Sequence, residues 1–252
     1  MWCSFPAPSG PGESFEIPDR GRSVMYLTGK ERGWIMLYEK LPQPTRERRT
    51  YTDEDVAAFA ARFADYPVNA QLHVRDVFAR RLTWGMSDLG EGVAGRWSGA
   101  GGRIVLVGDA CHKFTPNAGL GLNNAIQDVV VLSNGLWRAL REAENSDGPS
   151  GNRLDGETLS EVFRRYHAAR QEPLQKDYGR SALVTRLQAW ATPLHYVLSR
   201  FVFSFAFVAK LVTRFAVSPL LSRGLVLDYV PSSDLPAGKV PWEHRMPSSS
   251  SQ

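Results

Sequence analysis

The chain has 252 residues, of which 43% are hydrophobic and 22% charged, a balance typical of folded globular proteins and not of disordered ones. Its 30 basic and 26 acidic residues give a net charge of +4 without a long basic block, so we expect no nucleic-acid partner. Two cysteines, Cys3 and Cys111, are too few for a disulfide framework, and the N-terminus lacks a secretory pattern, so we expect an intracellular protein.

The first hundred residues predict part of an antiparallel sheet covered by a helix. Short apolar runs in residues 14–42 alternate with the turn sequences "PDRGR" and "GKERG", which predicts two or three antiparallel strands. Thr52 followed by Asp55 predicts the capped start of an amphipathic helix that lies across this sheet. Residues 73–86 carry a weaker signal, for a short helix or a strand.

The central segment predicts a buried strand, a tight loop and a long helix. The strand covers residues 104–107, and the sequence "GDACHKFTPNAGLGLNNA" follows it from Gly108. The helix begins near Leu122 and ends near Leu140. Its predicted core face consists of the apolar residues Leu122, Ile126, Val129, Leu136, Trp137 and Leu140.

The remainder predicts helices and irregular segments, which makes the whole an α+β architecture. Residues 145–155 are polar and glycine-rich, which predicts a surface loop. Helices are expected over about 160–176 and 180–200, and the tail after Pro231 reads as a Pro/Ser-rich coil.

Gly119 and Gly121 form a GxG that lacks the other features of a dinucleotide-binding fingerprint. Asn124 stands where the third glycine belongs, and eleven residues separate Gly108 from Leu120 after the strand. The "GPGES" near the N-terminus has proline between its glycines and no strand before it, and the chain has no P-loop sequence. This loop therefore does not hold a pyrophosphate in the usual way.

The same loop offers other binding chemistry. Asp109 places a carboxylate at a strand end, where it suits a sugar or polyol hydroxyl. Pro116 stiffens the turn, Gly119 and Gly121 let the backbone approach a flat ligand, and the start of the helix favours an anion. The alternative is that the acid simply caps a turn, and the loop residues alone leave both interpretations open.

The longer sequence "RIVLVGDACHKFTPNAGLGLNNAIQDVVVLSNGL" resembles the second flavin motif of the FAD-dependent monooxygenases related to para-hydroxybenzoate hydroxylase. In that family the motif reads strand, GDAAH, a proline, GxGxN and a helix, and here Cys111 replaces the second alanine. The segments "FEIPDR", "RW" at residues 96–97 and "LDYVP" at 227–231 are most similar to fungal enzymes that epoxidise or hydroxylate prenylated polyketides and indole diterpenes.

The resemblance implies that this segment binds FAD. Asp109 would hydrogen-bond the ribityl chain, and the loop with Pro116 and Gly119 would pass beside the isoalloxazine ring. Gly121, Leu122 and Asn123 would offer backbone N–H groups to the edge that becomes anionic on reduction.

The implied reaction is a monooxygenation. NAD(P)H would reduce the flavin, and a C4a-hydroperoxide would transfer oxygen to a lipophilic terpenoid or meroterpenoid substrate. The protein would mainly position the ring and exclude water, so no side chain is predicted to act as a general acid or base.

The chain departs from the family in one respect. The family opens with a strand and GxGxxG that bind the ADP half of FAD, and this sequence has neither. We therefore expect the C-terminal part of a monooxygenase: a remnant of the substrate-binding sheet domain in 1–100, the flavin-contacting strand, loop and helix in 101–145, a helical region in 146–222 and a tail in 223–252. A non-catalytic fragment or accessory protein that kept the fold is the alternative.

Two further groups of residues have alternative interpretations. Cys111 and His112 are neighbours, but the other histidines show no zinc-ligand spacing, so we expect no metal site and a supporting role for His112 beside the loop. Arg170 lies in "YHAARQEPLQ", which resembles a family segment that follows the flavin helix. We expect Arg170 to pack the helix or pin the loop and not to act in catalysis.

Residues 201–221, from Phe201 to Leu221, form an apolar run whose length would span a bilayer. Lys210 and Arg214 interrupt it, which favours an amphipathic helix with Phe201 and Phe215 on its apolar stripe. Contact with a membrane surface, a membrane-anchored interaction protein and docking onto another domain of the protein all remain open.

Overall fold

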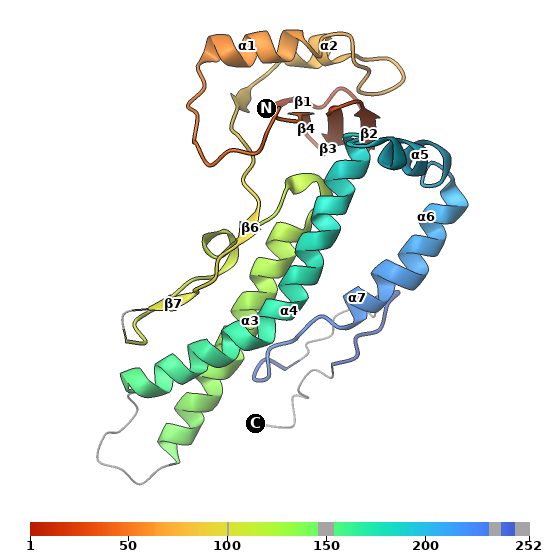
Figure 1. Cartoon of the computed structure of the whole chain (residues 1–252). Coiled ribbons are helices and arrows are strands. Elements are labelled where there is room, and N and C mark those ends of the chain that lie inside the picture. Colours follow the sequence, from red (N-terminus) through yellow and green to blue (C-terminus); the bar gives the residue numbers. More distant parts are fainter. Residues whose placement is uncertain (100, 146–153, 232–237, 245–252) are drawn as a thin grey trace. The chain divides into compact units, whose positions relative to one another are not determined.

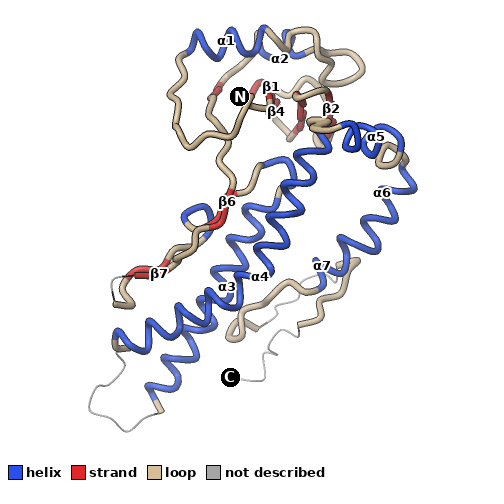
Figure 2. The backbone as a smooth tube through the Cα atoms, viewed as in Figure 1, coloured by secondary structure: helices blue, strands red, loops and turns tan. Residues whose placement is uncertain are grey.

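The computed structural model describes residues 1–99, 101–145, 154–231 and 238–244, and the chain divides into two compact units. The first unit comprises Met1–Leu89 and Leu183–Ser204, and the second comprises Gly90–Ala182 and Phe205–Gln252. Figures 1 and 2 show a sheet with short helices in the first unit and long helices in the second. These two units have other boundaries than the four segments predicted from the sequence. The assignment of those segments to a substrate-domain remnant, a flavin-contacting part, a helical region and a tail stays a prediction.

The first unit is built on a five-stranded antiparallel sheet in the order β2-β3-β4-β1-β5. The predicted strands and their two turns are confirmed as β2 (Ser14–Asp19), β3 (Arg22–Thr28) and β4 (Arg32–Glu39). The weak signal after residue 73 becomes both a helix, α2 (Val74–Phe78), and a strand, β5 (Thr83–Gly85). Strand β1 (Trp2–Pro6) was not predicted, because five residues that lead into a proline- and glycine-rich turn show too little alternation.

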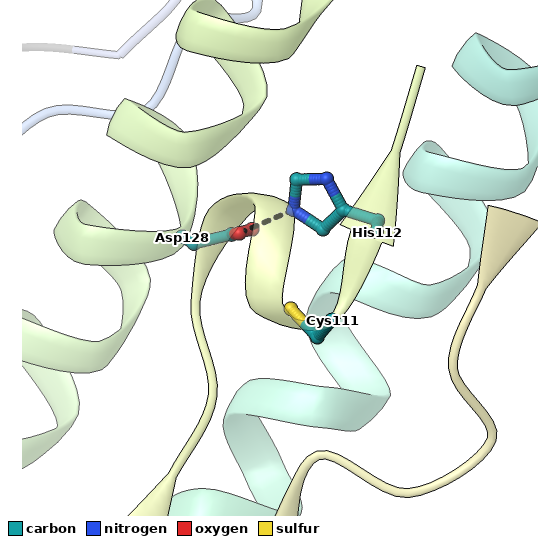
Figure 3. Close-up of side chains that lie close together, drawn as sticks. All are labelled: Cys111, His112 and Asp128. Atoms are coloured by element: carbon teal, nitrogen blue, oxygen red, sulfur yellow. Dashed lines mark hydrogen bonds and ion pairs between the residues drawn. The ribbon is translucent and has the colours of Figure 1, made fainter. Parts of the chain in front are cut away.

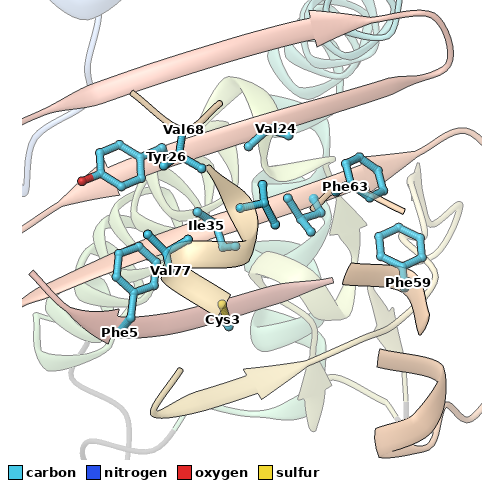
Figure 4. Close-up of a cluster of buried hydrophobic side chains, with 11 residues drawn as sticks. Cys3, Phe5, Val24, Tyr26, Ile35, Phe59, Phe63, Val68 and Val77 are labelled. Carbon is cyan, nitrogen blue, oxygen red and sulfur yellow. The ribbon is translucent and has the colours of Figure 1, made fainter. Parts of the chain in front are cut away.

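Helix α1 (Asp53–Ala61) covers one face of this sheet, as predicted. Thr52 accepts a hydrogen bond from the N–H of Asp55, whose carboxylate accepts from the N–H of Thr52, which completes a capping box. Figure 4 shows the resulting core, in which aromatic and branched side chains from the sheet meet those of the helices. Its buried residues are Cys3, Phe5, Val24, Tyr26, Ile35, Leu37, Phe59, Phe63, Val68, Val74 and Val77.

The second unit consists mainly of α3 (Leu120–Glu144) and most of α4 (Gly156–Gln188), whose last residues from Leu183 belong to the first unit. The two long helices lie side by side in Figures 1 and 2. Short strands precede them: β6 (Gly92–Val93) pairs with β9 (His112–Lys113), and β7 (Ser98–Gly99) pairs with β8 (Ile104–Val105). The 3-10 turns η1 (Gly108–Ala110) and η2 (Pro116–Ala118) connect these strands to α3. A buried cluster joins the short-strand segment to α4 and consists of Trp97, Cys111, Tyr166 and Leu174.

The predicted buried strand over 104–107 is wrong in extent and in burial. Only Ile104 and Val105 form a strand, and the Ile104 side chain is 56% exposed. Among the described residues β8 pairs with β7 alone, so one of its edges is left without a neighbouring strand.

The predicted core face of α3 is also wrong. Leu122, Ile126, Val129 and Leu140 are exposed, and Leu136 and Trp137 are half-buried. The helix instead buries Asn124, Asp128, Val130, Asn134 and Ala139. Hydrophobic periodicity fails here because the three buried polar side chains find specific partners, which offset the cost of their desolvation.

The helices after residue 155 differ from the prediction in where they break. A single helix, α4, continues past Gly179, and the break falls at residues 189–192, where Trp190 has a φ of +41°. Thr192 then caps α5 (Pro193–Phe201), with proline in the first turn.

The apolar run 201–221 is not one helix. Phe201 ends α5, and a new helical segment starts after Phe205 as α6 (Ala206–Val212), η3 (Thr213–Val217) and α7 (Ser218–Ser222). Phe201 and Phe215 therefore do not share a stripe. Among the described residues no single helix is long and apolar enough to cross a membrane, although the bent pair Pro193–Phe201 and Ala206–Ser222 meets that test together by length and composition.

Two predicted irregular segments lie largely outside the described residues. These are the loop over 145–155, of which 146–153 are not described, and the tail after Pro231, of which 232–237 and 245–252 are not described.

Gly33→Ala is expected to destabilise the first unit. Gly33 is buried in β4 opposite Phe5, and an added Cβ would lie 2.4 Å from the Phe5 ring, which is itself buried. Overpacking of this kind costs about 1–3 kcal/mol, measurable as a lower free energy of unfolding in urea. Gly10→Ala is the matched control, since nothing lies within 4 Å of its added Cβ. Equal stability of the two variants would contradict the packing argument.

Candidate functional site

The GDA turn of η1 is held in a conformation that requires glycine. Gly108 has a φ of +57°, and a Cβ at this position would lie 3.1 Å from the Cβ of Ala125 on α3. The close approach locks the turn against the first turns of α3. The next residue, Asp109, is exposed.

The six predicted binding residues lie on η1, on η2 and at the start of α3. Gly119 adopts the left-handed conformation (φ +64°, ψ 21°) and begins the helix two residues earlier than predicted. Open space surrounds Gly119 and Gly121, since nothing lies within 4 Å of a Cβ added at either residue. Pro116 and Asn123 are exposed, and Leu122 is 73% exposed, so this edge is free for a ligand within the described part of the chain.

The N-terminus of α3 is suited to negative charge. Its N-cap, Gly119, offers no side-chain acceptor, and the first turn contains no acidic residue. The first N–H groups of an α-helix have no partner inside the helix and carry a partial positive charge. The N–H groups of Leu120, Gly121 and Leu122 are therefore available to the anionic edge of a flat ligand, whereas the N–H of Asn123, four residues after the N-cap, faces the Gly119 carbonyl within the helix.

A buried carboxylate supports this surface from beneath. Asp128 on α3 is fully buried and accepts hydrogen bonds from the Gly108 N–H at 3.0 Å, from His112 Nε2 at 2.6 Å and from Arg170 Nε at 2.7 Å. Figure 3 shows His112 and Asp128 directed toward each other, with Cys111 beside them. One side chain thus links the GDA turn, the following strand and both long helices.

Arg170 extends the network along α4. Its Nη2 donates to the side-chain oxygen of Asn124 at 2.7 Å, and the Asn124 amide donates in turn to Asp177 at 3.1 Å. Tyr166, one turn before Arg170, donates to the backbone oxygen of Leu106 at 3.1 Å. The guanidinium is buried and bonds to Asp128 and Asn124 of α3, so Arg170 packs the two long helices together, one of the two structural roles expected for it.

The network controls the charge of its members. Burial alone would raise the pKa of Asp128, but hydrogen bonds from His112, Arg170 and the Gly108 N–H lower it below its usual value. Burial, together with the Asp128 charge, raises the pKa of the Cys111 thiol to about 11. Asp128 is therefore ionised and Cys111 a neutral thiol at pH 7.

Three of these residues could be taken for a metal site. Cys111, His112 and Asp128 offer ligand atoms that lie within 4.8 Å of one another. The surrounding charges disfavour a cation. Arg170 lies 2.7 Å from one oxygen of Asp128, and the other oxygen accepts two hydrogen bonds. A raised thiol pKa also disfavours the thiolate that a metal needs. The geometry favours a hydrogen-bonded ion pair.

Sequence reasoning missed the buried polar face of α3. The sequence did carry a sign of this face: the polar residues Asn124, Asp128 and Asn134 recur on one side of the helix. Asn134 donates to the backbone oxygen of Val226 at 2.9 Å and accepts from the N–H of Asp228 at 2.9 Å. Residues 225–228 are thereby held along α3 beside a cavity of about 780 Å³ between α3 and α4.

Comparisons with known proteins place similar sequences among flavin enzymes. The model of the FAD binding domain family matches residues 28–148. FAD-dependent monooxygenase SAT1 from Stachybotrys chartarum is 42% identical over 90% of this chain and 74% of its own length. FAD-dependent monooxygenase cdmI from Talaromyces verruculosus is 31% identical over 88% of this chain and 45% of its own length.

The fold is shared with a solved structure. The crystal structure of pqsL from Pseudomonas aeruginosa superposes with a TM-score of 0.50 at 19% identity, over 74% of this chain and 48% of pqsL. The chain thus spans less than half the length of cdmI and of pqsL, and about three quarters of SAT1.

Asp128→Asn is expected to destabilise the second unit strongly. The substitution leaves the buried guanidinium of Arg170 without its counter-charge, and breaking a buried pair costs about 3–5 kcal/mol. Urea unfolding would measure the loss. Glu161→Gln is the control, because Glu161 also pairs with two arginines but on the exposed side of α4, where little change is expected. Similar losses in both variants would contradict a special role for the buried network.

The stability difference between the native chain and Asp128→Asn is expected to shrink in acid. The folded-state pKa of Asp128 lies below its usual value of 3.8, so its contribution is complete above that pH and is lost as pH falls through the folded pKa. Urea unfolding of both proteins between pH 6 and pH 2, roughly the window in which carboxylates titrate, would measure it. A difference that grows in acid would mean that burial raises the pKa instead.

Proposed function

The chain belongs to the FAD-dependent monooxygenases, and we propose that it forms the flavin-ring side of an enzyme that oxygenates a lipophilic terpenoid or meroterpenoid. NAD(P)H is the proposed reductant. Because the chain spans only part of most relatives reported above, the complete reaction is proposed for the protein that carries this chain together with an adenosine-binding part.

The observation that carries the proposal is that the exposed Asp109 lies on η1, which Gly108 brings against Ala125 of α3, while the N-terminus of α3 is uncapped. A polyol chain suits the Asp109 carboxylate, and the anionic edge of a reduced flavin suits the unpartnered N–H groups of Gly121 and Leu122. The open space at Gly119 and Gly121 admits a flat ring against the backbone.

Within this proposal each residue has a separate task. The flavin, when bound, supplies the reactivity toward NAD(P)H and oxygen. The helix N-terminus stabilises negative charge at the ring edge, and Asp109 orients the ribityl chain. Leu122 presents an apolar side chain at the same edge, where it excludes water. Asp128 acts at a distance, because it fixes the N–H of Gly108 and hence the position of Asp109.

The substrate class rests on the short segments that resemble fungal enzymes acting on prenylated compounds. Of these, residues 227–231 lie partly along α3, where Arg138 pairs with Asp228 and Trp137 stacks on Tyr229. The competing function is a non-catalytic fragment or accessory protein that kept the fold.

Titration of the purified chain with FAD, followed by flavin absorbance and fluorescence, tests the proposal. We expect saturable binding that Asp109→Ala weakens at least tenfold, since hydrogen bonds to charged groups contribute roughly 1.5–3 kcal/mol. Cys111→Ala is the control, because the Cys111 side chain is buried behind the turn.

Equal loss in both variants would remove the role proposed for Asp109. No binding by the unaltered chain would favour the accessory function, or a site that requires the adenosine-binding part.

A further inference from the structure

We propose that the helix formed by α6, η3 and α7, here called the Ala206–Ser222 helix, docks on the surface of an anionic lipid bilayer. Most of its apolar side chains are exposed, including Phe207 at 62%, Phe215 at 69% and Leu221 at 57%. Apolar helices of soluble proteins normally bury such side chains, and exposed apolar patches mark interaction sites.

The charge of this helix selects the partner. Lys210 and Arg214, one turn apart, are its charged residues, and both are basic. No Asp or Glu occurs in the sequence between Asp177 and Asp228. Among the described residues neither Lys210 nor Arg214 has an ion-pair partner, whereas Arg223 lies 3.5 Å from Glu243 just beyond the helix. An apolar surface with two cations that lack a counter-charge in the described part of the chain complements anionic lipid headgroups.

The placement of the two cations favours lipid over protein. Lys210 and Arg214 stand among Phe207, Leu211 and Phe215 and not on a separate polar face. Charged residues are depleted from the core of a protein interface, where they would be desolvated. At a bilayer surface their long side chains can instead reach the phosphates while their methylene groups stay in the apolar layer.

The helix is expected to lie in the interface and not to cross the bilayer. At 1.5 Å per residue it rises about 25 Å, which is less than the roughly 30 Å hydrocarbon core. Lys210 and Arg214 fall near the middle of its length, where a spanning helix would carry them to the costliest depth. This inference is independent of the flavin proposal, because it uses none of the residues near Asp109.

Flotation of the purified chain with vesicles tests the inference. We expect co-flotation with phosphatidylcholine vesicles that contain phosphatidylserine, an anionic lipid of the cytoplasmic leaflet, and much weaker flotation with phosphatidylcholine alone. Each basic residue near an anionic surface changes partitioning about fivefold, so Lys210→Glu with Arg214→Glu should reduce binding at least tenfold. Phe207→Ser with Phe215→Ser should also abolish flotation.

Ile126→Ser with Val129→Ser is the matched control. Ile126 and Val129 are equally apolar and are each 49% exposed, but they lie on α3, whose exposed stripe has no such pair of cations. Binding retained in this control and lost in the helix variants supports the inference. Equal loss in all variants, or no flotation of the unaltered chain, overturns it in favour of non-specific adhesion or of a protein partner.

A second measurement does not depend on whether the double variants fold. Phe215→Cys can be labelled with an environment-sensitive maleimide, because Cys3 and Cys111 are buried and burial raises their thiol pKa values to about 12 and about 11. Transfer of the probe into the apolar layer would shift its emission to the blue when anionic vesicles are added. An unchanged spectrum on vesicles that float the chain would place the lipid contact elsewhere and overturn the inference.

Discussion

The second unit depends on one buried carboxylate. Asp128 has no solvent around it, so its charge must be balanced within the protein, and Arg170, His112 and the Gly108 N–H together do so. Each of these partners comes from a different element. The electrostatic requirement of a single side chain therefore fixes α3 against α4 and holds the GDA turn against both.

This constraint explains the inverted orientation of α3. A helix that must aim Asn124, Asp128 and Asn134 at buried partners cannot also turn Ile126 and Val129 inward, because these apolar residues lie on other sides of the same helix. The polar contacts are specific and the apolar ones are not. The apolar stripe near the α3 N-terminus is consequently exposed at the edge where the flavin is proposed to bind.

The sequence predicted features that depend on near neighbours. Thr52 and Asp55 satisfy each other within one turn, and β2 to β4 are joined by short turns, so both could be predicted from spacing alone. The GDA loop was predicted as a candidate binding loop from its own residues, and its assignment to a flavin came from the resemblance to a family. The inward face of α3 could not be predicted, because Asp128 meets Arg170 across 42 residues and Asn134 meets Val226 across 92. Sequence periodicity carries no information about such partners.

The two exposed apolar surfaces of the second unit differ in a way that assigns them different roles. On α3 the apolar residues adjoin an uncapped helix N-terminus, whose partial positive charge is fixed in the backbone and directed at one spot. On the Ala206–Ser222 helix the positive charge belongs to Lys210 and Arg214, whose flexible side chains can follow a fluid surface. A fixed dipole suits a rigid, oriented ring, whereas mobile cations suit headgroups that move. The same combination of apolar area and positive charge thus supports a cofactor site in one place and a lipid surface in the other.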